Sequence, residues 1–382
     1  MRIIYYSKTF FTDCDFPLIR EFQRIGASVW YFFPMDEGNT RQALLDIKQI
    51  KGKKGIFRAS EYVDLSIYKE YIDLDKVFVI NIPSGGADWK NKLFWIYVFI
   101  KMLLIRADIF HFTWQLLNRE KYLYHLPCKK VMTVHDPISH SSVKDEQDEI
   151  ERKEAFSHSD GFMLLSNALA KQFSDKFNIP SEKIFFSHMG EFSHLRYVKS
   201  KESSYPKPYI LYFGQILSYK GIEYLCEAMT IIHEKHPEIN LLIAGRGKIY
   251  FDYSRYEKLP YIHLKNEYIS ISDLATMLQG ALFSVCPYKD ATQSGVVQTS
   301  FSANCPMIVT NVGALPESCK DNLYGKVVPP CDAESLARAI DELLSSPSTL
   351  EQYRQNINTQ WRKSMSWESI AQDYLKAWKN IL

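Results

Sequence analysis

The residues best suited to chemistry lie between two predicted strands in the second half of the chain. In this interpretation one strand ends at Pro287, the polar loop DATQSG follows over residues 290–295, and a helix begins near Gly295. Ligands of open α/β sheets bind beyond the carboxyl ends of strands, and a helix N-terminus offers unpaired N–H groups to an anion. With Gln293 and Ser294 beside that terminus, the sequence predicts a diphosphate site. An ordinary helix cap has the same composition, so this alternative stays open.

A second phosphate contact is predicted at an equivalent strand end earlier in the chain. The stretch FGQILSYKG, residues 213–221, leaves a predicted strand and places Lys220 where the next helix begins. An ammonium group there would neutralise a phosphate bound at the same edge of the sheet. A solvated lysine at a helix start is the competing interpretation.

The elements that must hold these residues alternate between strands and helices in two blocks. The predicted strands are RIIYY, SVWYFF, KVFVINI, DIFHF, KVMTV and GFMLL in the first half, and YILYF, INLLIAG, LFSVC and PMIVT in the second. Helices between such strands are typical of parallel sheets, and 382 residues exceed one ordinary core. The polar, proline-containing segment YVKSKESSYPKP, residues 197–208, predicts a linker. We therefore expect α/β domains over 1–200 and 206–365, and a C-terminal helix over 366–382 that could pack back on the first domain.

The bulk composition argues against several classes of protein. The 46 Lys plus Arg residues nearly balance the 44 Asp plus Glu, so the net charge of +2 gives no reason to expect nucleic acid as a partner. The seven cysteines form no Cys-x-x-Cys pair, which favours neither a zinc site nor a disulfide framework and suits the cytoplasm. Gly245 and Gly247 lack the third glycine of a dinucleotide fingerprint. The acidic pair of Asp13 and Asp15 reads as solvated surface, so we expect no obligatory metal.

One strongly apolar segment, LFWIYVFIKMLLI over residues 93–105, is too short for a bilayer, which needs roughly 20 such residues. We expect a helix buried against the sheet, while its basic flank could contact an anionic membrane. That contact would place a cytoplasmic protein at the inner face of the cell membrane. The basic residues of the 88–130 region are Lys90, Lys92, Lys101, Arg106, Arg119, Lys121, Lys129 and Lys130.

Four segments in order, GQILSYKG, LLIAGRG, PYKDATQSGV and PMIVTNVGALPE, resemble the donor-binding domain of family 4 retaining glycosyltransferases of the bacterial surface-polysaccharide type. In the first half, DIFHFTW, VMTVHDP, LSNALAKQF and PSEKIFFSHMGEF resemble the corresponding segments of that family. The resemblance implies an α/β fold of GT-B architecture, with two Rossmann-like domains facing a central cleft. It also implies transfer of a sugar from a UDP- or GDP-linked donor to a saccharide or lipid-linked saccharide acceptor, with retention of configuration, in cell-surface polysaccharide synthesis.

The same resemblance assigns roles to single residues. His135 matches the histidine that faces the transferred sugar, and Lys220 matches the basic residue that neutralises the donor phosphates, so both are expected to be catalytic. Tyr268 falls where such proteins flank the nucleotide base. His111 and His188 are weaker candidates and more often structural. The expected donor-binding residues are Gly214, Gln215, Lys220, Arg246, Tyr268, Asp290, Gln293, Ser294, Gly295, Val296 and Thr299.

The chain also departs from the family pattern. Gln215 stands where an arginine is usual, and Arg246 or Lys289 could supply the missing charge. The paired glutamates of the family align with Ala291 and Thr299, neither of which is acidic.

Asp290 is the carboxylate nearest to the first of these positions, and Glu317 lies in a later predicted loop. The segment SKTFFTDCDF replaces the glycine pair expected in the first loop of the N-terminal domain. Two alternatives therefore stay open: a catalytically silent nucleotide-sugar-binding subunit of a transferase complex, and a sugar-nucleotide epimerase of the same architecture.

Overall fold

The computed structural model describes residues 1–35, 50–62, 72–83, 89–138, 146–192, 195, 205–291 and 295–382. The chain divides into two compact units. Unit 1 contains Met1–Pro137, Lys144–Gly190 and Trp367–Leu382, and unit 2 contains Ile138–Val143 and Glu191–Ser366. Gln293 and Ser294 lie outside the described residues, as do residues 197–204 of the expected linker.

Unit 1 is built on an eight-stranded sheet with the order β3-β4-β2-β1-β5-β6-β7-β8. Neighbouring strands are parallel except for β3, which pairs antiparallel with β4. The inner strands are almost continuously buried because helices cover both faces of the sheet, as is usual for parallel sheets. The strands are β1 Arg2–Tyr6, β2 Ser28–Met35, β3 Gly55–Arg58, β4 Val77–Asn81, β5 Ile109–Phe112, β6 Lys129–Val134, β7 Gly161–Leu164 and β8 Ile184–Phe186.

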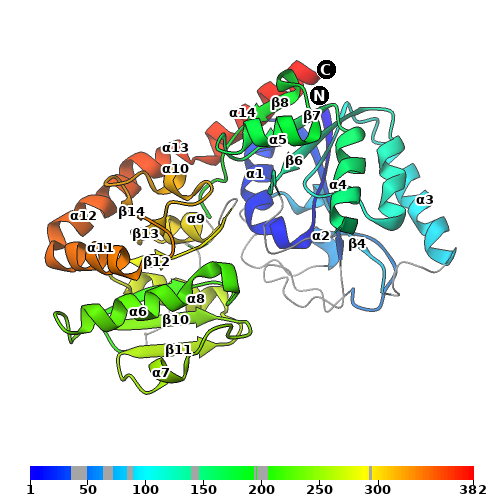
Figure 1. The fold of residues 1–382 in the computed structure, drawn as a ribbon. Coiled ribbons are helices and arrows are strands. Elements are labelled where there is room, and N and C mark those ends of the chain that lie inside the picture. Colours follow the sequence, from blue (N-terminus) through cyan, green and yellow to red (C-terminus); the bar gives the residue numbers. More distant parts are fainter. Residues whose placement is uncertain are drawn as a thin grey trace. The chain divides into compact units, whose positions relative to one another are not determined.

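The helices of unit 1 lie on both faces of this sheet (Figure 1). Alternate residues of one strand point to opposite faces, so Ile4 and Tyr6 of β1 join the cluster containing Trp95 and Val98 of α3. The helices are α1 Thr12–Arg24, α2 Ala59–Tyr62, α3 Trp89–Leu103, α4 Glu146–Ser157, α5 Ala170–Phe177 and α14 Trp367–Ile381, with 3₁₀ turns at Thr9–Phe11, Leu74–Lys76, Asn118–His125 and Ser181–Lys183.

Helix α14 packs beside α1 in unit 1, although all of unit 2 separates the two helices in the chain. Its apolar stripe includes Tyr374 and Trp378, both buried. The Trp378 indole donates a hydrogen bond to His111 Nδ1 at 3.0 Å, and Tyr374 Oη lies 3.1 Å from Thr133 Oγ1. The last helix is therefore fixed to the sheet by apolar burial and by polar bonds at defined positions.

Unit 2 contains a six-stranded, fully parallel sheet with the order β11-β10-β9-β12-β13-β14. Its strands are β9 Tyr209–Phe213, β10 Asn240–Gly245, β11 Ile262–Asn266, β12 Ser284–Cys286, β13 Met307–Thr310 and β14 Gly325–Val328. Its helices are α6 Ile222–His233, α7 Ser254–Glu257, α8 Ile271–Gly280, α9 Gly295–Ser302, α10 Leu315–Cys319, α11 Ala333–Ser345, α12 Pro347–Asn356 and α13 Arg362–Ser364, with a 3₁₀ turn at Ser218–Lys220 and a π-helical turn at Ile357–Trp361.

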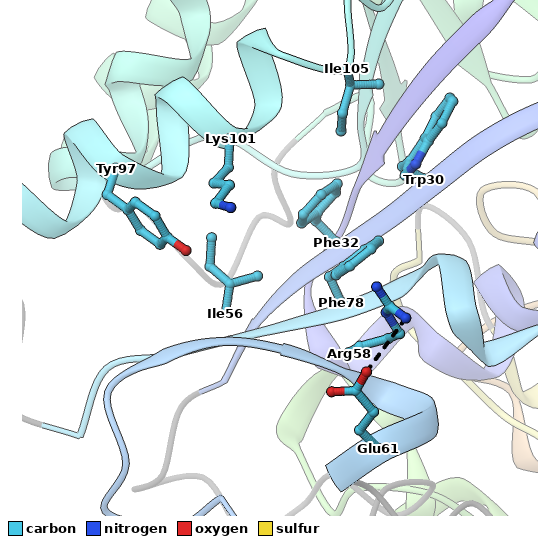
Figure 2. A pocket seen from close by; sticks show the side chains of 9 residues that line it. All are labelled: Trp30, Phe32, Ile56, Arg58, Glu61, Phe78, Tyr97, Lys101 and Ile105. Atoms are coloured by element: carbon cyan, nitrogen blue, oxygen red, sulfur yellow. Dashed lines mark ion pairs between the residues drawn. The ribbon is translucent and has the colours of Figure 1, made fainter.

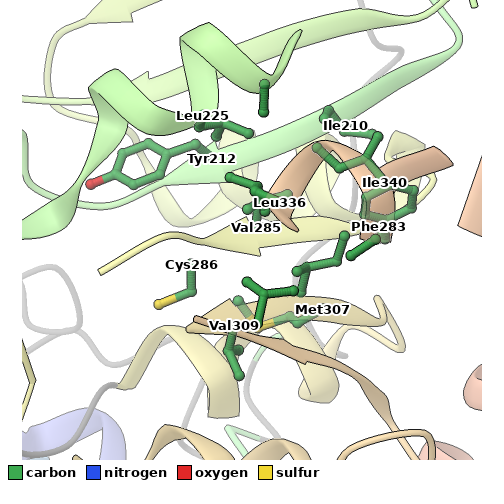
Figure 3. Packing of buried hydrophobic residues seen from close by; sticks show 14 of the residues in the cluster. Ile210, Tyr212, Leu225, Phe283, Val285, Cys286, Met307, Val309, Leu336 and Ile340 are labelled. Atoms are coloured by element: carbon green, nitrogen blue, oxygen red, sulfur yellow. The ribbon is translucent and has the colours of Figure 1, made fainter. Parts of the chain in front are cut away.

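The main core of unit 2 lies between the sheet and the adjacent helices α6 and α11. Figure 3 shows Ile210 and Tyr212 of β9 on the same side as Leu225 of α6 and Leu336 of α11. The alternate residues of β9, such as Leu211, point to the opposite face of the sheet, where they pack with Met277 of α8. The apolar stripe of α6 is buried along its whole length.

Two sequence interpretations of unit 1 are wrong in part. Asp15 is buried rather than solvated, and its carboxylate accepts hydrogen bonds from Tyr5 at 3.2 Å and Tyr31 at 2.9 Å. The apolar segment at 93–105 is helical, but only one face is buried. Leu93 and Leu104 are 60% and 70% exposed. An unbroken apolar run has no periodicity, so its sequence could not show which face is solvated.

Candidate functional site

Each sheet has a point at which its strand order reverses, so that the loops at its carboxyl edge diverge there. In unit 2 the chain runs from β9 to β10 and β11 on one side and then continues with β12 on the other side of β9. The loops after β9 and β12 therefore diverge, and ligands of open α/β sheets bind at such a point. Gly214 and Gln215 directly follow β9, while Asp290 lies in the loop after β12.

Glycines let the loops after β9 and β10 pack backbone against backbone. A Cβ on Gly245 would lie 1.7 Å from the Gly214 carbonyl oxygen, and one on Gly247 would lie 2.1 Å from that of Ile216. Gly214 itself has a φ of +128°, which favours glycine. The end of β11 is joined to the same loops by the side chain of Asn266. This side chain accepts a hydrogen bond from the Gly247 N–H at 3.1 Å and donates one to the Gly247 carbonyl at 3.0 Å. These contacts hold the backbone of the three loops in place at the carboxyl edge of the unit 2 sheet.

Helix α9 begins beside these loops. A Cβ on Gly214 would lie 3.7 Å from Val296 Cγ2, so the first turn of α9 packs against the end of β9. The Thr299 hydroxyl donates to the Gly295 carbonyl at 2.7 Å within the helix. The structure therefore brings Gly214, Gly295 and Val296 together and places the N-terminus of α9, the positive end of its dipole, beside the end of β9.

Lys220 ends the 3₁₀ turn before α6 and extends over aromatic rings. Its Nζ lies 3.6 Å from the centroid of the buried Tyr288 ring and 4.7 Å from that of Tyr219. Burial lowers its pKa to about 8. Within the described part of the chain no carboxylate pairs with this ammonium group, and the negative ring faces offer only partial compensation. Such a half-buried cation is suited to an anionic ligand.

Glycine at position 221 is what allows Lys220 to approach the loop after β12. Gly221 has a φ of +65°, and a Cβ there would lie 2.0 Å from the Pro287 carbonyl oxygen. The Lys289 N–H donates to the Tyr219 carbonyl at 2.8 Å and joins the same two segments. The turn that carries the lysine is therefore held directly against the end of β12.

Lys289 and Arg246, the two other cations proposed for the carboxyl edge of unit 2, differ in whether a carboxylate neutralises them. Lys289 Nζ is paired with Glu223 at 2.7 Å, and the same carboxylate accepts a hydrogen bond from Tyr250. Arg246 is exposed on the loop after β10, and its backbone carbonyl accepts from the Ile216 N–H at 3.1 Å. Lys289 is thus already neutralised, whereas the guanidinium of Arg246 faces solvent at the carboxyl edge.

The remaining candidates of unit 2 have the following positions. Tyr268 follows β11 and is 53% exposed, as a residue that stacks on a base would be. Gln215 is exposed at the β9 end, and Ala291 is buried after β12. Glu317 lies in helix α10 rather than in the loop that we expected.

In unit 1 the corresponding point, where the strand order reverses, lies between β1 and β5. His135 directly follows β6, the next strand. Its ring stacks on Phe11 with centroids 3.7 Å apart and an interplanar angle of 8°. Its Nε2 is closed off from solvent and has no hydrogen-bond partner among the described residues. Burial lowers the pKa of His135 to about 4, so the imidazole is neutral at pH 7.

Three aromatic side chains beside His135 were not recognised in the sequence. Phe10 and Phe11 follow β1, and Trp114 follows β5. Phe10 lies 4.5 Å from Phe11 and 5.8 Å from Trp114, and it is 55% exposed. Their common position at the carboxyl ends of adjacent strands was the available signal. Exposed aromatic faces of this kind can pack on the apolar face of a ligand.

His111 and His188 do not join this site. His111 is buried within β5, where Nδ1 accepts from Trp378 and Nε2 lies 2.8 Å from Thr133 Oγ1. Its Nε2 therefore carries the proton, and burial lowers its pKa to about 3. His188 is exposed after β8. In the described ranges no group of three His, Cys, Asp or Glu side chains could hold a metal ion, and no helix is long and apolar enough to cross a membrane.

Comparison with known proteins gives matches of two kinds. Residues 207–346 match the family model described as glycosyl transferases group 1. An uncharacterized glycosyltransferase of Methanocaldococcus jannaschii is 26% identical over 234 residues, which are 57% of this chain and 59% of that protein. The chain therefore spans about half the length of the curated relatives it matches.

Solved structures match over the full length. Sucrose-phosphate synthase from Thermosynechococcus elongatus aligns with 100% of this chain and 99% of its own, with a TM-score of 0.70 and 15% identity. The Anabaena protein HepE, solved in complex with UDP-glucose, aligns over 99% of both chains with a TM-score of 0.68 and 11% identity. These likenesses show the GT-B fold, as the sequence predicted. Together with the family match, they support a place in the GT-B glycosyltransferase superfamily.

Proposed function

We propose that this chain, as a GT-B protein with a group 1 glycosyltransferase segment, transfers a sugar with retention of configuration from a UDP- or GDP-linked donor. The acceptor would be a saccharide or lipid-linked saccharide, and the role would be synthesis of cell-surface polysaccharide at the inner face of the membrane. The observation that carries the proposal is Lys220, a half-buried cation with no paired carboxylate among the described residues, at the same sheet edge as the first turn of α9. The bound UDP-glucose of HepE is consistent with this donor class.

The donor diphosphate would bind between Lys220 and the N-terminus of α9. As the glycosidic bond breaks, negative charge grows on the departing diphosphate. A desolvated ammonium group and the positive end of a helix stabilise that charge more in the transition state than in the ground state. Gly214 lets the phosphates approach the backbone, Arg246 supplies solvent-facing charge, and Tyr268 would flank the base. Asp290, Gln293, Ser294 and Thr299 complete the proposed donor-binding set.

His135 would act as a neutral hydrogen-bonding group rather than as an acid. A histidine with a pKa of about 4 carries no charge at pH 7, but its Nε2 can bond a sugar hydroxyl. A buried nitrogen without a hydrogen-bond partner destabilises the ligand-free protein. A ligand that supplies the missing bond removes this cost. Phe10 and Trp114 beside it would contact the apolar face of a saccharide. We place acceptor binding on this edge of unit 1.

Contact with an anionic membrane would use α3. Its exposed apolar residues include Leu93, Ile100 and Leu103, and Lys92 and Lys101 are exposed on the same helix. Apolar side chains beside lysines suit the interface of a bilayer with negative lipids. Flotation with vesicles tests this contact separately from the chemistry.

The test begins with UDP-, GDP-, dTDP- and ADP-sugars in a thermal shift screen. A donor at about 100 times its dissociation constant should stabilise the protein by roughly 2.7 kcal/mol. Slow hydrolysis of that donor is then measured in the wild type, Lys220→Ala and His135→Ala, and both variants should lose it. Stabilisation without turnover would favour the silent subunit, and conversion of the donor to an epimeric nucleotide sugar, in place of release of free sugar, would favour the epimerase. No stabilisation by any nucleotide sugar would refute the transferase.

A further inference from the structure

A cavity of 330 Å³ lies between α3 and the edge strands β2, β3 and β4 of unit 1. Figure 2 shows Tyr97 and Lys101 projecting from α3 toward Phe32, Phe78 and Ile56 of the strands. Trp30 and Phe78 lie near the amino ends of β2 and β4 and Phe32 lies in the middle of β2, whereas His135 follows the carboxyl end of β6. The cavity is therefore separate from the proposed reaction site.

The cavity has an apolar floor and a positive rim. Phe32 and Phe78 stack with centroids 4.8 Å apart, and Trp30 lies on the same face two residues before Phe32. Two cations line the opening, Lys101 and Arg58. Arg58 is paired with Glu61 at 3.4 Å, which leaves one net positive charge at the rim. An aromatic floor beside an ammonium group is suited to a ligand with an apolar body and an anionic group.

The cavity continues into the exposed apolar face of α3. Tyr97 belongs to both, since it lines the cavity and is 44% exposed. A second apolar hollow of 210 Å³ lies on the other side of the helix, where Ile96 and Phe99 meet Tyr122. A row of large exposed apolar side chains between two hollows is unusual for a surface that faces only water. The exposed apolar residues of this face are Leu93, Ile96, Tyr97, Ile100, Leu103 and Leu104.

The charges around this face are almost all positive. Residues 89–106 contain no Asp or Glu, and Arg106 is exposed just beyond the helix. At the other end, Lys54 donates a hydrogen bond to Asn91 at 2.6 Å, so the turn that carries the exposed Lys51 and Lys53 lies beside the start of α3. Apolar side chains surrounded by lysines are complementary to anionic lipid rather than to a neutral or cationic partner.

We propose that the cavity binds one anionic lipid molecule, with its phosphate at Lys101 and part of its hydrocarbon chain over Trp30, Phe32 and Phe78. The proposal rests on the membrane contact of α3 given above and adds a defined site to it. A volume of 330 Å³ lies at the small end of the range for ligand pockets, so the cavity could hold one chain segment but not a whole phospholipid.

Trp30 provides the direct test, because bromine atoms quench indole fluorescence at contact. Vesicles of phosphatidylcholine with phosphatidylglycerol are prepared with either ordinary or brominated phosphatidylglycerol chains. Wild type should float with both, and the brominated lipid should quench a component of its fluorescence that Trp30→Phe lacks. Equal quenching in wild type and Trp30→Phe, with flotation intact, would overturn the cavity site alone. No flotation of the wild type would overturn both the membrane contact and the cavity site, and it would leave donor turnover as a separate question.

A matched pair of charge reversals gives an independent measurement. Lys92→Glu and Lys101→Glu change the same charge on the same exposed helix, but only Lys101 lines the cavity. Surface attraction alone is worth about 1 kcal/mol per lysine, which is about fivefold in affinity, and should be similar for both positions. We expect Lys101→Glu to lose at least about fivefold more vesicle affinity than Lys92→Glu, with unchanged thermal unfolding of both. Equal losses would contradict the proposal.

Discussion

The lowered pKa of Lys220 makes donor binding depend on pH in a predictable direction. Burial holds this pKa at about 8, and a bound diphosphate would favour the ammonium form and raise it. The deprotonated fraction of the free protein is about one tenth at pH 7, one half at pH 8 and nine tenths at pH 9. Because only the protonated form pairs with phosphate, the dissociation constant should rise about tenfold from pH 7 to pH 9.

Calorimetric titration with the donor found in the thermal shift screen measures this change. Lys220→Arg is the matched control, since a guanidinium stays charged over the whole range. Any pH dependence that remains in Lys220→Arg belongs to the nucleotide itself and is subtracted. Lys220→Met should bind more weakly at pH 7 by roughly 1.5–3 kcal/mol, which is about ten- to hundredfold.

The reasoning is refuted if wild-type affinity stays constant between pH 7 and pH 9. It is equally refuted if Lys220→Arg shows the same fall as the wild type, because the titrating group would then lie elsewhere. If Lys220→Met bound the donor with wild-type affinity, this lysine would not be part of the donor site.

Three further predictions concern the buried histidines of unit 1. Phe11→Ala should hydrate the imidazole of His135 and raise its pKa from about 4 toward 6.5 in an NMR titration, whereas Phe10→Ala should leave it unchanged. Trp378→Phe removes the N–H that His111 accepts, so urea titration should show a loss of about 1–3 kcal/mol; an unchanged midpoint would mean that this bond does not hold α14. The folded pKa values of His111 and His135, about 3 and about 4, lie below 6.5, so their stabilising contribution is complete above pH 6.5 and is lost as pH falls. Between pH 6.5 and pH 5 each should cost unit 1 about 2 kcal/mol, and equal unfolding free energies at the two pH values would contradict their burial.

The parallel strands were predictable because they are buried on both faces and read as short apolar runs. Strands β1, β5, β6, β9, β10 and β13 match such runs closely. The missed strands carry weaker signals. β3 has no fully buried residue, and β11 is buried only at Ile262, so neither forms a continuous apolar run. Position at the edge of a sheet, rather than a lack of propensity, explains these omissions.

The chemistry of single positions could be predicted only where it depends on chain order. The glycines after β9 and β10 and the lysine before α6 follow from strand ends and motif spacing. The neutralisation of Lys289 by Glu223 depends on two residues 66 apart in sequence. The aromatic group of Phe10, Phe11 and Trp114 likewise requires the sheet to bring two distant loops together. Local patterns carry no information about such pairs.

During translation, unit 1 cannot complete its packing until α14 has been synthesised, because that helix follows all of unit 2 in the chain. Until Trp378 emerges, the nitrogen of His111 has no donor and the ring of Phe22, which lies 4.8 Å from the Trp378 ring, is left open to water. Burial of Tyr374 and Trp378 contributes roughly 1.5–3 kcal/mol each, a large share of the net stability of a domain. Nascent unit 1 would therefore remain a client of chaperones until translation has passed unit 2. Cleavage before Trp367 would leave a complete sheet without these contacts, and the free energy of unfolding of unit 1 should fall.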